Sequence, residues 1–337
     1  MIRILRSGPL NTIQDLGRAE GRRWGVSRAG AMDTVALRTA NALLGQAAGE
    51  AAIEVAIFPF ELRFAVDCAF AVTGAGAATL DGRPLPASWA LRASARQTLT
   101  LDQGPRGVFG YVAFAGGLDV PERLGSRATD LKGGFGGADG KGLSSGQTLH
   151  LRPGVQEAGV PAEGYGLSFG ALPARRTGTQ GETRVRAIAA AEWDAFTDEA
   201  RRIFENSLWT VSRDVNRTGY RLSGPSLRTR SPLELLSHGL VPGVVQVPPS
   251  GQPIVQMADA NTAGGYPKIA TVISADLWAL AQTRSGEPVG FDLVSWEEAI
   301  AAMRELDRRV LALDMALRAA RERNAAGASL RMSQAQP

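Results

Sequence analysis

The chain has 337 residues, of which 44% are hydrophobic and 21% charged, so it is long enough for a packed core in one large or two medium domains. Its formal charge of +4 is spread along the sequence without a dense Lys/Arg run, which argues against nucleic-acid binding. The single cysteine, Cys68, excludes an intramolecular disulfide and a cysteine metal cluster. Because no window reaches the apolar length of a membrane span and the first residues carry no long apolar run, we expect a cytoplasmic protein without membrane contact.

The first expected element in chain order is a helix at 34–44, which Asp33 can cap and Gly45 can end. Short runs of β type follow, and runs such as Thr98–Leu101 alternate polar and apolar residues as half-buried strands do. Dense Gly/Pro turn signals between the runs favour barrels or sandwiches over alternating strands and helices. We expect strands at 52–57, 61–66, 70–73, 98–101, 108–114, 148–151, 184–188, 209–212, 244–247, 254–258 and 289–294.

A second helix is expected at about 190–204, and a third begins at Ser295, which forms a capping-box pattern with Glu298. Apolar residues then recur at steps of three and four as far as Leu317. This spacing fits a terminal helix that docks on its own domain, which we favour, or an oligomerisation helix. The predicted fold class is mainly β with a few helices (a β-rich α+β fold). The expected parts are a β-rich subdomain at 1–165, a second β-barrel subdomain at 166–294, a helix at 295–323 and a disordered tail at 324–337.

Several familiar catalytic motifs are absent from the sequence. There is no GxxxxGK[ST] loop and no GxGxxG turn between a strand and a helix, so no Walker-type ATP site is expected in this chain. His150 and His238 are the only histidines, too few for a histidine metal cluster, and no metal site is predicted. The Met-Lys-Met sequence that usually carries biotin is also missing.

Two Gly/Pro-rich loops, Gln246–Pro253 and Asp259–Lys268, carry most of the remaining polar candidates. Proline fixes the backbone and glycine lets it approach a ligand closely, so such loops can present amide groups at fixed positions, as an oxyanion or carboxylate site requires. Lys268 would add a positive charge, and lysine is scarce here, since Lys132 and Lys141 are the only others. The alternative is a structural turn with a surface lysine.

A third polar segment, Arg213–Leu222, contains three arginines, an acid and Tyr220. Arg217 or Arg221 could hold a carboxylate through two parallel hydrogen bonds. An exposed hairpin whose charges pair with each other explains the same residues equally well.

Six stretches of the sequence together resemble one protein family. They are Thr12–Arg18, Ala113–Pro121, Leu124–Asp130, Asn216–Leu222, Gln246–Pro253 and Ala263–Ala270. In order and spacing they are similar to the biotin-dependent carboxyltransferase family, which includes the C subunit of 5-oxoprolinase, the Kip-type antagonist of a sporulation kinase inhibitor and the allophanate hydrolase subunit 2 group. Two positions depart from the expected pattern: Thr218 stands where we expect methionine, and Ala263 where we expect threonine.

The resemblance implies cyclophilin-like β-barrel subdomains and membership of an ATP-dependent 5-oxoprolinase complex that opens 5-oxo-L-proline to L-glutamate. It implies that the direct partner is the B subunit of 5-oxoprolinase, that the third component is its A subunit, that ATP binds mainly with these partners, and that the B/C pair forms a homo-oligomer. One alternative is a biotin-dependent carboxyltransferase component acting on urea or a similar amide, with biotin as its cofactor. Another is a non-enzymatic antagonist that binds a kinase-inhibitor partner.

The implied chemistry needs an anion site and a carboxylate clamp, because a lactam is a poor electrophile whose carbonyl oxygen ATP would activate. On this basis Lys268, with Gln252 and the glycine amides, is expected to stabilise an oxyanion. Asp259 would orient Lys268 or water, and Arg217 would clamp a carboxylate. The other expected substrate-binding residues are Tyr220, Gln246, Ser250, Gly264, Gly265 and Tyr266. The sequence leaves open whether this chain supplies catalytic groups or shapes a partner's site.

Overall fold

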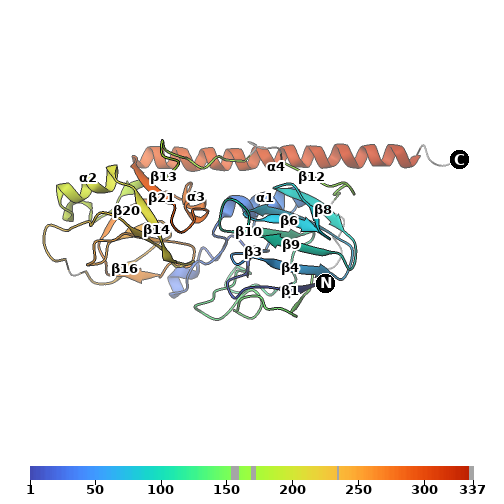
Figure 1. Ribbon diagram of the computed structural model, residues 1–337, viewed down its shortest axis with the longest axis horizontal. Coiled ribbons are helices and arrows are strands. Elements are labelled where there is room, and N and C mark those ends of the chain that lie inside the picture. The colour runs from blue at the N-terminus through green and yellow to red at the C-terminus, as the bar shows by residue number, and fades with distance from the viewer. Residues whose placement is uncertain (153–158, 168–171, 234, 334–337) are drawn as a thin grey trace. The chain divides into compact units, whose positions relative to one another are not determined.

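The computed structural model describes residues 1–152, 159–167, 172–233 and 235–333, with side chains in the last helix as far as residue 323. The chain divides into two compact units, each built mainly from strands as predicted (Figure 1). The first unit comprises Met1–Gly17, Thr34–Leu172 and Arg308–Pro337, and the second comprises Arg18–Asp33 and Pro173–Asp307.

The first unit contains two six-stranded sheets. One has the order β11 (Thr148–Leu149), β1 (Ile2–Arg6), β4 (Phe60–Phe64), β9 (Thr98–Asp102), β6 (Ala77–Leu80) and β7 (Arg83–Pro84). The other has the order β12 (Tyr165–Gly166), β8 (Trp89–Ala93), β5 (Cys68–Gly74), β10 (Gly110–Phe114), β3 (Ala52–Val55) and β2 (Thr12–Gln14). The paired strands in both sheets are antiparallel.

The core of this unit lies between the two sheets. Phe64 of β4 packs on Phe70 of β5 with ring centroids 5.1 Å apart, and its ring meets Phe114 of β10 edge-on at 6.3 Å. Strand β9 alternates buried and half-exposed residues because only one of its faces meets this core, whereas β10 is buried throughout. The second face of β5 and β10 is covered by α1 (Thr34–Leu44), the helix expected at these residues, which ends at Gly45 with a positive φ of 70°.

The second unit is a closed seven-stranded barrel, in agreement with the cyclophilin-like fold that the family resemblance implies. Its order is β13 (Thr183–Ala189), β20 (Lys268–Val272), β17 (Val244–Gln246), β18 (Ile254–Gln256), β15 (Gly219–Ser223), β14 (Trp209–Val215) and β21 (Pro288–Leu293). Only the contact between β13 and β21 is parallel among the described barrel pairs. A separate ribbon pairs β16 (His238–Gly239) with β19 (Ala263–Gly264).

The second unit also contains short helices. They are the 3₁₀ helices η1 (Gly21–Trp24) and η2 (Trp193–Ala195) and the α-helices α2 (Asp198–Asn206) and α3 (Leu277–Ala281). The single helix expected at 190–204 is interrupted, because Phe196 is extended and Thr197 caps α2 by accepting a hydrogen bond from the Ala200 amide. Phe204 of α2 stacks on Phe291 of β21 with centroids 4.5 Å apart, which fixes α2 on the barrel.

Figure 1 shows the last helix, α4 (Trp296–Ser333), which begins with the predicted capping box. The Ser295 amide donates to Glu298 Oε2 at 2.7 Å, and the Glu298 amide donates to Ser295 Oγ at 3.1 Å. The helix continues past the expected end at residue 323 to Ser333, and of the expected tail only residues 334–337 lie outside the described residues.

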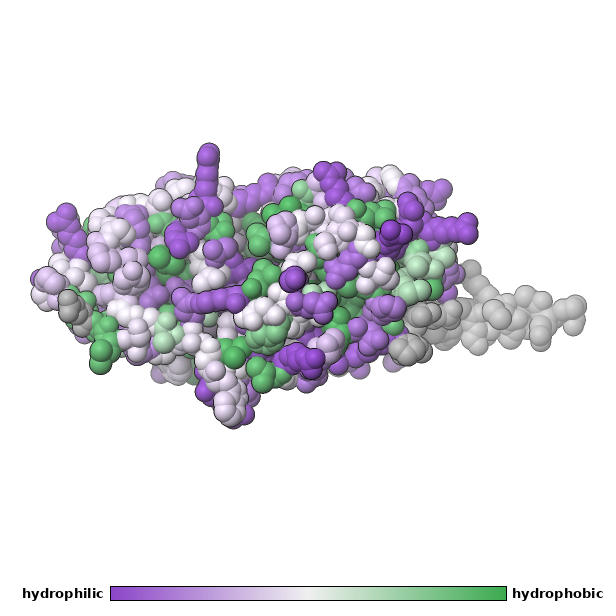
Figure 2. Space-filling view, turned by 90° about the horizontal axis from the view of Figure 1, so that it is seen from below, coloured by the Kyte–Doolittle hydropathy of each residue, from purple (hydrophilic) through white to green (hydrophobic). Residues whose placement is uncertain are grey.

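The molecular face in Figure 2 mixes hydrophilic residues with small scattered apolar areas. No broad apolar patch is visible on that face. None of the helices in the described part of the chain combines the length and apolar character needed to cross a bilayer.

Candidate functional site

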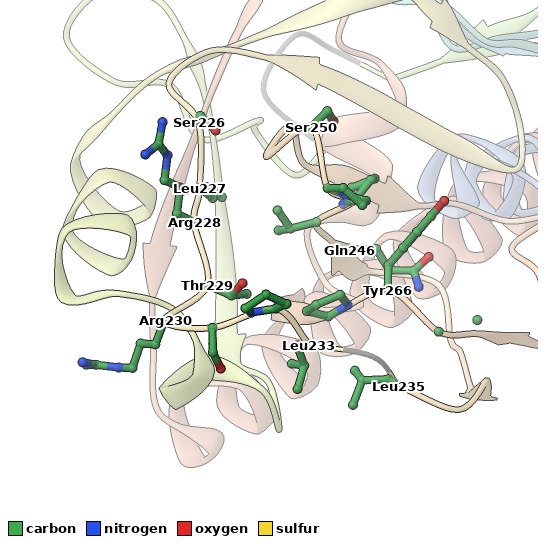
Figure 3. Close-up of a pocket in the computed structure, with 18 of the residues that line it drawn as sticks. Ser226, Leu227, Arg228, Thr229, Arg230, Leu233, Leu235, Gln246, Ser250 and Tyr266 are labelled. Carbon is green, nitrogen blue, oxygen red and sulfur yellow. The ribbon is translucent and has the colours of Figure 1, made fainter.

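A candidate site is a cavity of about 1220 Å³ within the second unit (Figure 3). One wall is the segment from Ser226 to Leu233, and the facing wall combines the end of β17 with the loop around β19. The lining residues are Ser226–Leu233, Leu235, Gln246–Ser250, Asn261 and Gly264–Pro267. In Figure 3 the side chains of Arg228 and Arg230 point away from Gln246 and Tyr266, so neutral polar and apolar groups face the cavity on that side.

Gln246 is the polar group that the structure prepares most clearly for a ligand. It is 5% exposed, and Gln256 Nε2 of the neighbouring strand donates to its Oε1 at 3.0 Å. That hydrogen bond fixes the amide, and its Nε2 has no partner among the described residues. A buried donor without an acceptor costs about 1–3 kcal/mol, so an acceptor atom on a bound molecule would be stabilised there.

The backbone around Gln246 is irregular in a way that suits a binding site. The register between β17 and β20 shifts between Val245 and Gln246, so that Gln246 lies opposite Lys268. Such a bulge turns a side chain out of the regular alternation of the strand. Tyr266, 48% exposed, lies beside Gln246 in Figure 3 and gives the cavity an aromatic edge.

Because Gly264 has no side chain, the Gln246 amide can occupy the space next to it. A Cβ atom at this position would lie 2.9 Å from Gln246 Nε2 and 2.8 Å from Leu240 Cδ1, closer than real Cβ contacts allow. The Gly264→Ala variant should therefore displace the Gln246 amide while the flexible Leu240 tip yields. If the cavity binds a ligand through Gln246, we expect the affinity for that ligand to fall about tenfold, the effect of losing roughly 1.4 kcal/mol of hydrogen bonding.

Gly239→Ala is the matched control for this substitution. Gly239 belongs to the strand paired with β19, and a Cβ there meets no atom within 4 Å. The ligand affinity and the melting temperature of this variant should equal those of the unmodified chain. Equal loss in both variants would mean that the ribbon, and not the Gln246 amide, is what the alanine disturbs.

Lys268 is placed behind the loop and does not line the cavity. It is 5% exposed, and its Nζ donates to the carbonyl oxygens of Tyr266 at 3.0 Å and Gly264 at 3.3 Å. Burial lowers the pKa of its ammonium group, and the nearby Glu192 carboxylate acts in the opposite direction. This arrangement holds the Gly264–Tyr266 turn in one conformation.

Glu192 also contributes to the structure around the cavity, but the sequence does not identify it, because it lies far from the polar loops along the chain and in a segment without a motif. Its Oε2 accepts a hydrogen bond from the Lys268 amide at 3.0 Å, and its Oε1 lies 3.5 Å from His238 Nε2. His238, 44% exposed at its side chain, also places Nδ1 3.1 Å from the Leu236 carbonyl oxygen. Glu192 therefore links β20 to the ribbon that borders the cavity.

Arg217 and Asp259 come together as a buried ion pair. Arg217 Nε and Nη2 donate to the two carboxylate oxygens of Asp259 at 2.9 and 2.8 Å, and Nη2 also donates to the Gly30 carbonyl oxygen at 2.6 Å. Both residues are 5% exposed, and neither lines the cavity. In this geometry both oxygens of Asp259 are engaged by Arg217.

The ten expected site residues thus separate into two groups. Five line the cavity: Gln246, Ser250, Gly264, Gly265 and Tyr266. The other five, Lys268, Asp259, Arg217, Tyr220 and Gln252, do not. The Tyr220 hydroxyl donates to the Ala281 carbonyl oxygen at 2.8 Å, and Gln252 makes two hydrogen bonds to the backbone of Gly224.

The described residues do not gather three or more His, Cys, Asp or Glu side chains in an arrangement that could hold a metal ion. Arg228 and Arg230 line the same cavity, and Arg230 Nη2 donates to Asp198 Oδ1 at 2.8 Å.

Comparison with known proteins agrees with the barrel fold and the loop motifs. The sequence pattern of the carboxyltransferase domain, subdomain A and B, matches residues 24–293, and the chain belongs to this family. It is 42% identical over 310 residues to the 5-oxoprolinase C subunit of Escherichia coli (strain K12), covering 91% of this chain and 96% of that protein. Its identity to the 5-oxoprolinase C subunit of Haemophilus influenzae is also 42%, over 306 residues, covering 90% of this chain and 95% of that protein.

Among solved structures, the K. lactis urea amidolyase superposes with a TM-score of 0.84 at 26% sequence identity. The match covers 93% of this chain and 20% of the amidolyase chain, so the present chain spans about a fifth of that structure.

Proposed function

We propose that the chain is the C subunit of an ATP-dependent 5-oxoprolinase, which opens the cyclic amide 5-oxo-L-proline to L-glutamate. The observation that carries the proposal is the 42% identity to two proteins of that name over nearly their whole length. The B subunit is the direct partner, the A subunit is the third component, and the complex works in the cytoplasm.

The cavity supports a defined part for this chain in the reaction. A lactam carbonyl oxygen is a hydrogen-bond acceptor, and it becomes more negative when water attacks its carbon. Gln246 lines the cavity, and its Nε2 is a buried donor without a partner among the described residues that would reach this oxygen after a small turn of the amide. Lys268 acts on the site through the turn it holds, as a positioning residue for Gly264 and Tyr266.

ATP is placed on the partner subunits in this proposal. The absence of a Walker loop from the sequence supports this placement. When bound in the complex, ATP supplies the activation of the lactam oxygen, and the present chain supplies binding and orientation of the amide.

A biotin-dependent carboxyltransferase is the second candidate, and the likeness to the K. lactis urea amidolyase favours it. The ureido oxygen of biotin is an acceptor that Gln246 Nε2 could also meet. The lower identity of this relative, 26% against 42%, places the 5-oxoprolinase proposal first.

Coexpression with the two candidate partner proteins tests the function. The purified complex should form ADP and glutamate only when 5-oxo-L-proline, ATP and all three subunits are present. Urea-dependent carboxylation with a biotinylated carrier would support the second candidate instead. Tight binding to the B subunit without any turnover of the complete complex would contradict both enzyme proposals and support an antagonist.

A further inference from the structure

Gln246 and Gln256 form a buried pair of amide side chains at the cavity. Gln246 ends β17 and Gln256 ends β18, and these two strands are antiparallel neighbours in the barrel. Each glutamine is 5% exposed, and Gln256 Nε2 donates to Gln246 Oε1 at 3.0 Å. Gln246 lines the cavity (Figure 3) and Gln256 does not, so Gln256 acts on a ligand there only through Gln246.

The pair leaves one donor and one acceptor without a partner among the described residues. These two atoms are Gln246 Nε2 and Gln256 Oε1, and both are buried. A buried amide atom without a hydrogen bond destabilises the fold, so the stability of the barrel does not explain two of them in one pair. A ligand with an acceptor atom would satisfy the Gln246 donor.

Two orientations of this pair have the same number of hydrogen bonds. In the structure Gln256 donates, and the donor end of Gln246 is left for a ligand. If both amides turn by about 180°, Gln246 Nε2 donates to Gln256 Oε1 instead, and the acceptor end of Gln246 is left. A ligand that brings an acceptor atom adds a hydrogen bond to the first orientation only, and it therefore selects that orientation.

The lactam carbonyl of 5-oxo-L-proline and the ureido carbonyl of biotin both present such an acceptor oxygen. We propose that Gln256 is a positioning residue, which holds Gln246 Oε1 and so directs Gln246 Nε2 to the carbonyl oxygen of the ligand. This role rests on the proposed function or on its second candidate, in which a carbonyl compound occupies the cavity. Residue 256 then sets whether the cavity offers a donor or an acceptor, without touching the ligand.

The affinity of the assembled complex for a carbonyl ligand tests this role. Calorimetric titration uses 5-oxo-L-proline and, in parallel, free biotin, each with and without a non-hydrolysable ATP analogue. Gln256→Met removes the donor at similar size and should weaken binding about threefold. An ionised Gln256→Glu side chain can only accept, so Gln246 must turn Nε2 toward it. Binding should then weaken about thirtyfold, because an acceptor faces the ligand oxygen.

The pH dependence of the Gln256→Glu defect separates a positioning role from a structural one. Burial favours the neutral form of a carboxyl group, and that form has an O–H donor that can hold Gln246 Oε1 as Gln256 does. The defect should therefore grow from about threefold at about pH 5.5 to about thirtyfold at about pH 9, while the Gln256→Met defect stays constant. Each variant is compared with the unmodified complex at the same pH, so that the titration of other groups, His238 included, cancels.

Gln147→Glu is the matched control for the chemical change. Gln147 Oε1 accepts a hydrogen bond from the Ser144 amide at 3.1 Å in the first unit, and a carboxylate keeps this role. The ligand affinity of its complex should equal that of the unmodified complex at both pH values. Urea unfolding shows whether each variant is folded. If Gln256→Glu does not fold, Gln256→Met decides, and an unchanged affinity in that variant overturns the proposal.

Failure of this role and failure of the proposed function give different results. An unmodified complex that binds biotin but not 5-oxo-L-proline contradicts the 5-oxoprolinase proposal, and the comparison at residue 256 is then made with biotin. Equal affinities of the Gln256→Glu and Gln256→Met complexes at both pH values overturn the role of Gln256 and leave the proposed function standing. An unmodified complex that binds neither ligand overturns both.

Discussion

The Asp259→Ala variant is expected to lose about 3–5 kcal/mol of unfolding free energy. Asp259 accepts two hydrogen bonds from Arg217, and both residues are 5% exposed. Removing the carboxylate leaves a buried guanidinium without its counter-charge, which costs far more than the net contribution of an exposed pair. Urea unfolding of the isolated chain, followed by tryptophan fluorescence, measures the loss.

The double variant Asp259→Leu/Arg217→Met is the control for this prediction. Replacing both members by apolar groups of similar size removes the unpaired charge, and stability should recover to within about 1–2 kcal/mol of the unmodified chain. The same pair of variants separates a structural from a catalytic role. If Asp259→Ala keeps full stability and the assembled enzyme loses turnover, Asp259 orients Lys268 or water, as the family resemblance implies.

Local patterns made much of the fold predictable. The Ser295–Glu298 capping box, the Gly45 stop and the alternation in Thr98–Leu101 each involve neighbouring residues, and each appears in the structure. The break between η2 and α2 was not predictable in this way. Phe196 continues an apolar helical pattern, but its bridge to Thr229 holds it extended, and that contact joins residues far apart in the sequence.

The residues of the candidate site also separate into those that sequence motifs identify and those that only the fold places. Gln246, Gly264 and Tyr266 lie in loops whose Gly/Pro pattern is visible in the sequence, and they line the cavity. The facing wall at 226–233 has no motif and is placed by the barrel, so sequence patterns could not identify it. The sequence identifies Lys268 and Arg217 as polar candidates, but it does not show that their partners in the fold are two carbonyl groups and Asp259.

Gln246→Glu is expected to lower kcat/KM of the assembled 5-oxoprolinase by about 10²–10³-fold. The new carboxylate can still accept the hydrogen bond from Gln256 Nε2, so the side chain keeps its position. It can no longer donate, and it places negative charge where the lactam oxygen becomes negative. Loss of one donor to a developing oxyanion typically has an effect of this size. Steady-state rates of glutamate formation measure it.

Gln252→Glu is the matched control, because the same chemical change is made at a glutamine outside the cavity. Gln252 makes its hydrogen bonds to the backbone of Gly224 and does not line the cavity. Its variant should keep kcat/KM within about twofold of the unmodified enzyme, since one exposed hydrogen bond contributes little. The opposite result, with Gln252→Glu inactive and Gln246→Glu active, would assign the oxyanion to Gln252 and remove the cavity from the reaction. Since the two glutamines differ in burial and in partners, this comparison decides which end of the Gln246–Pro253 loop carries the chemistry.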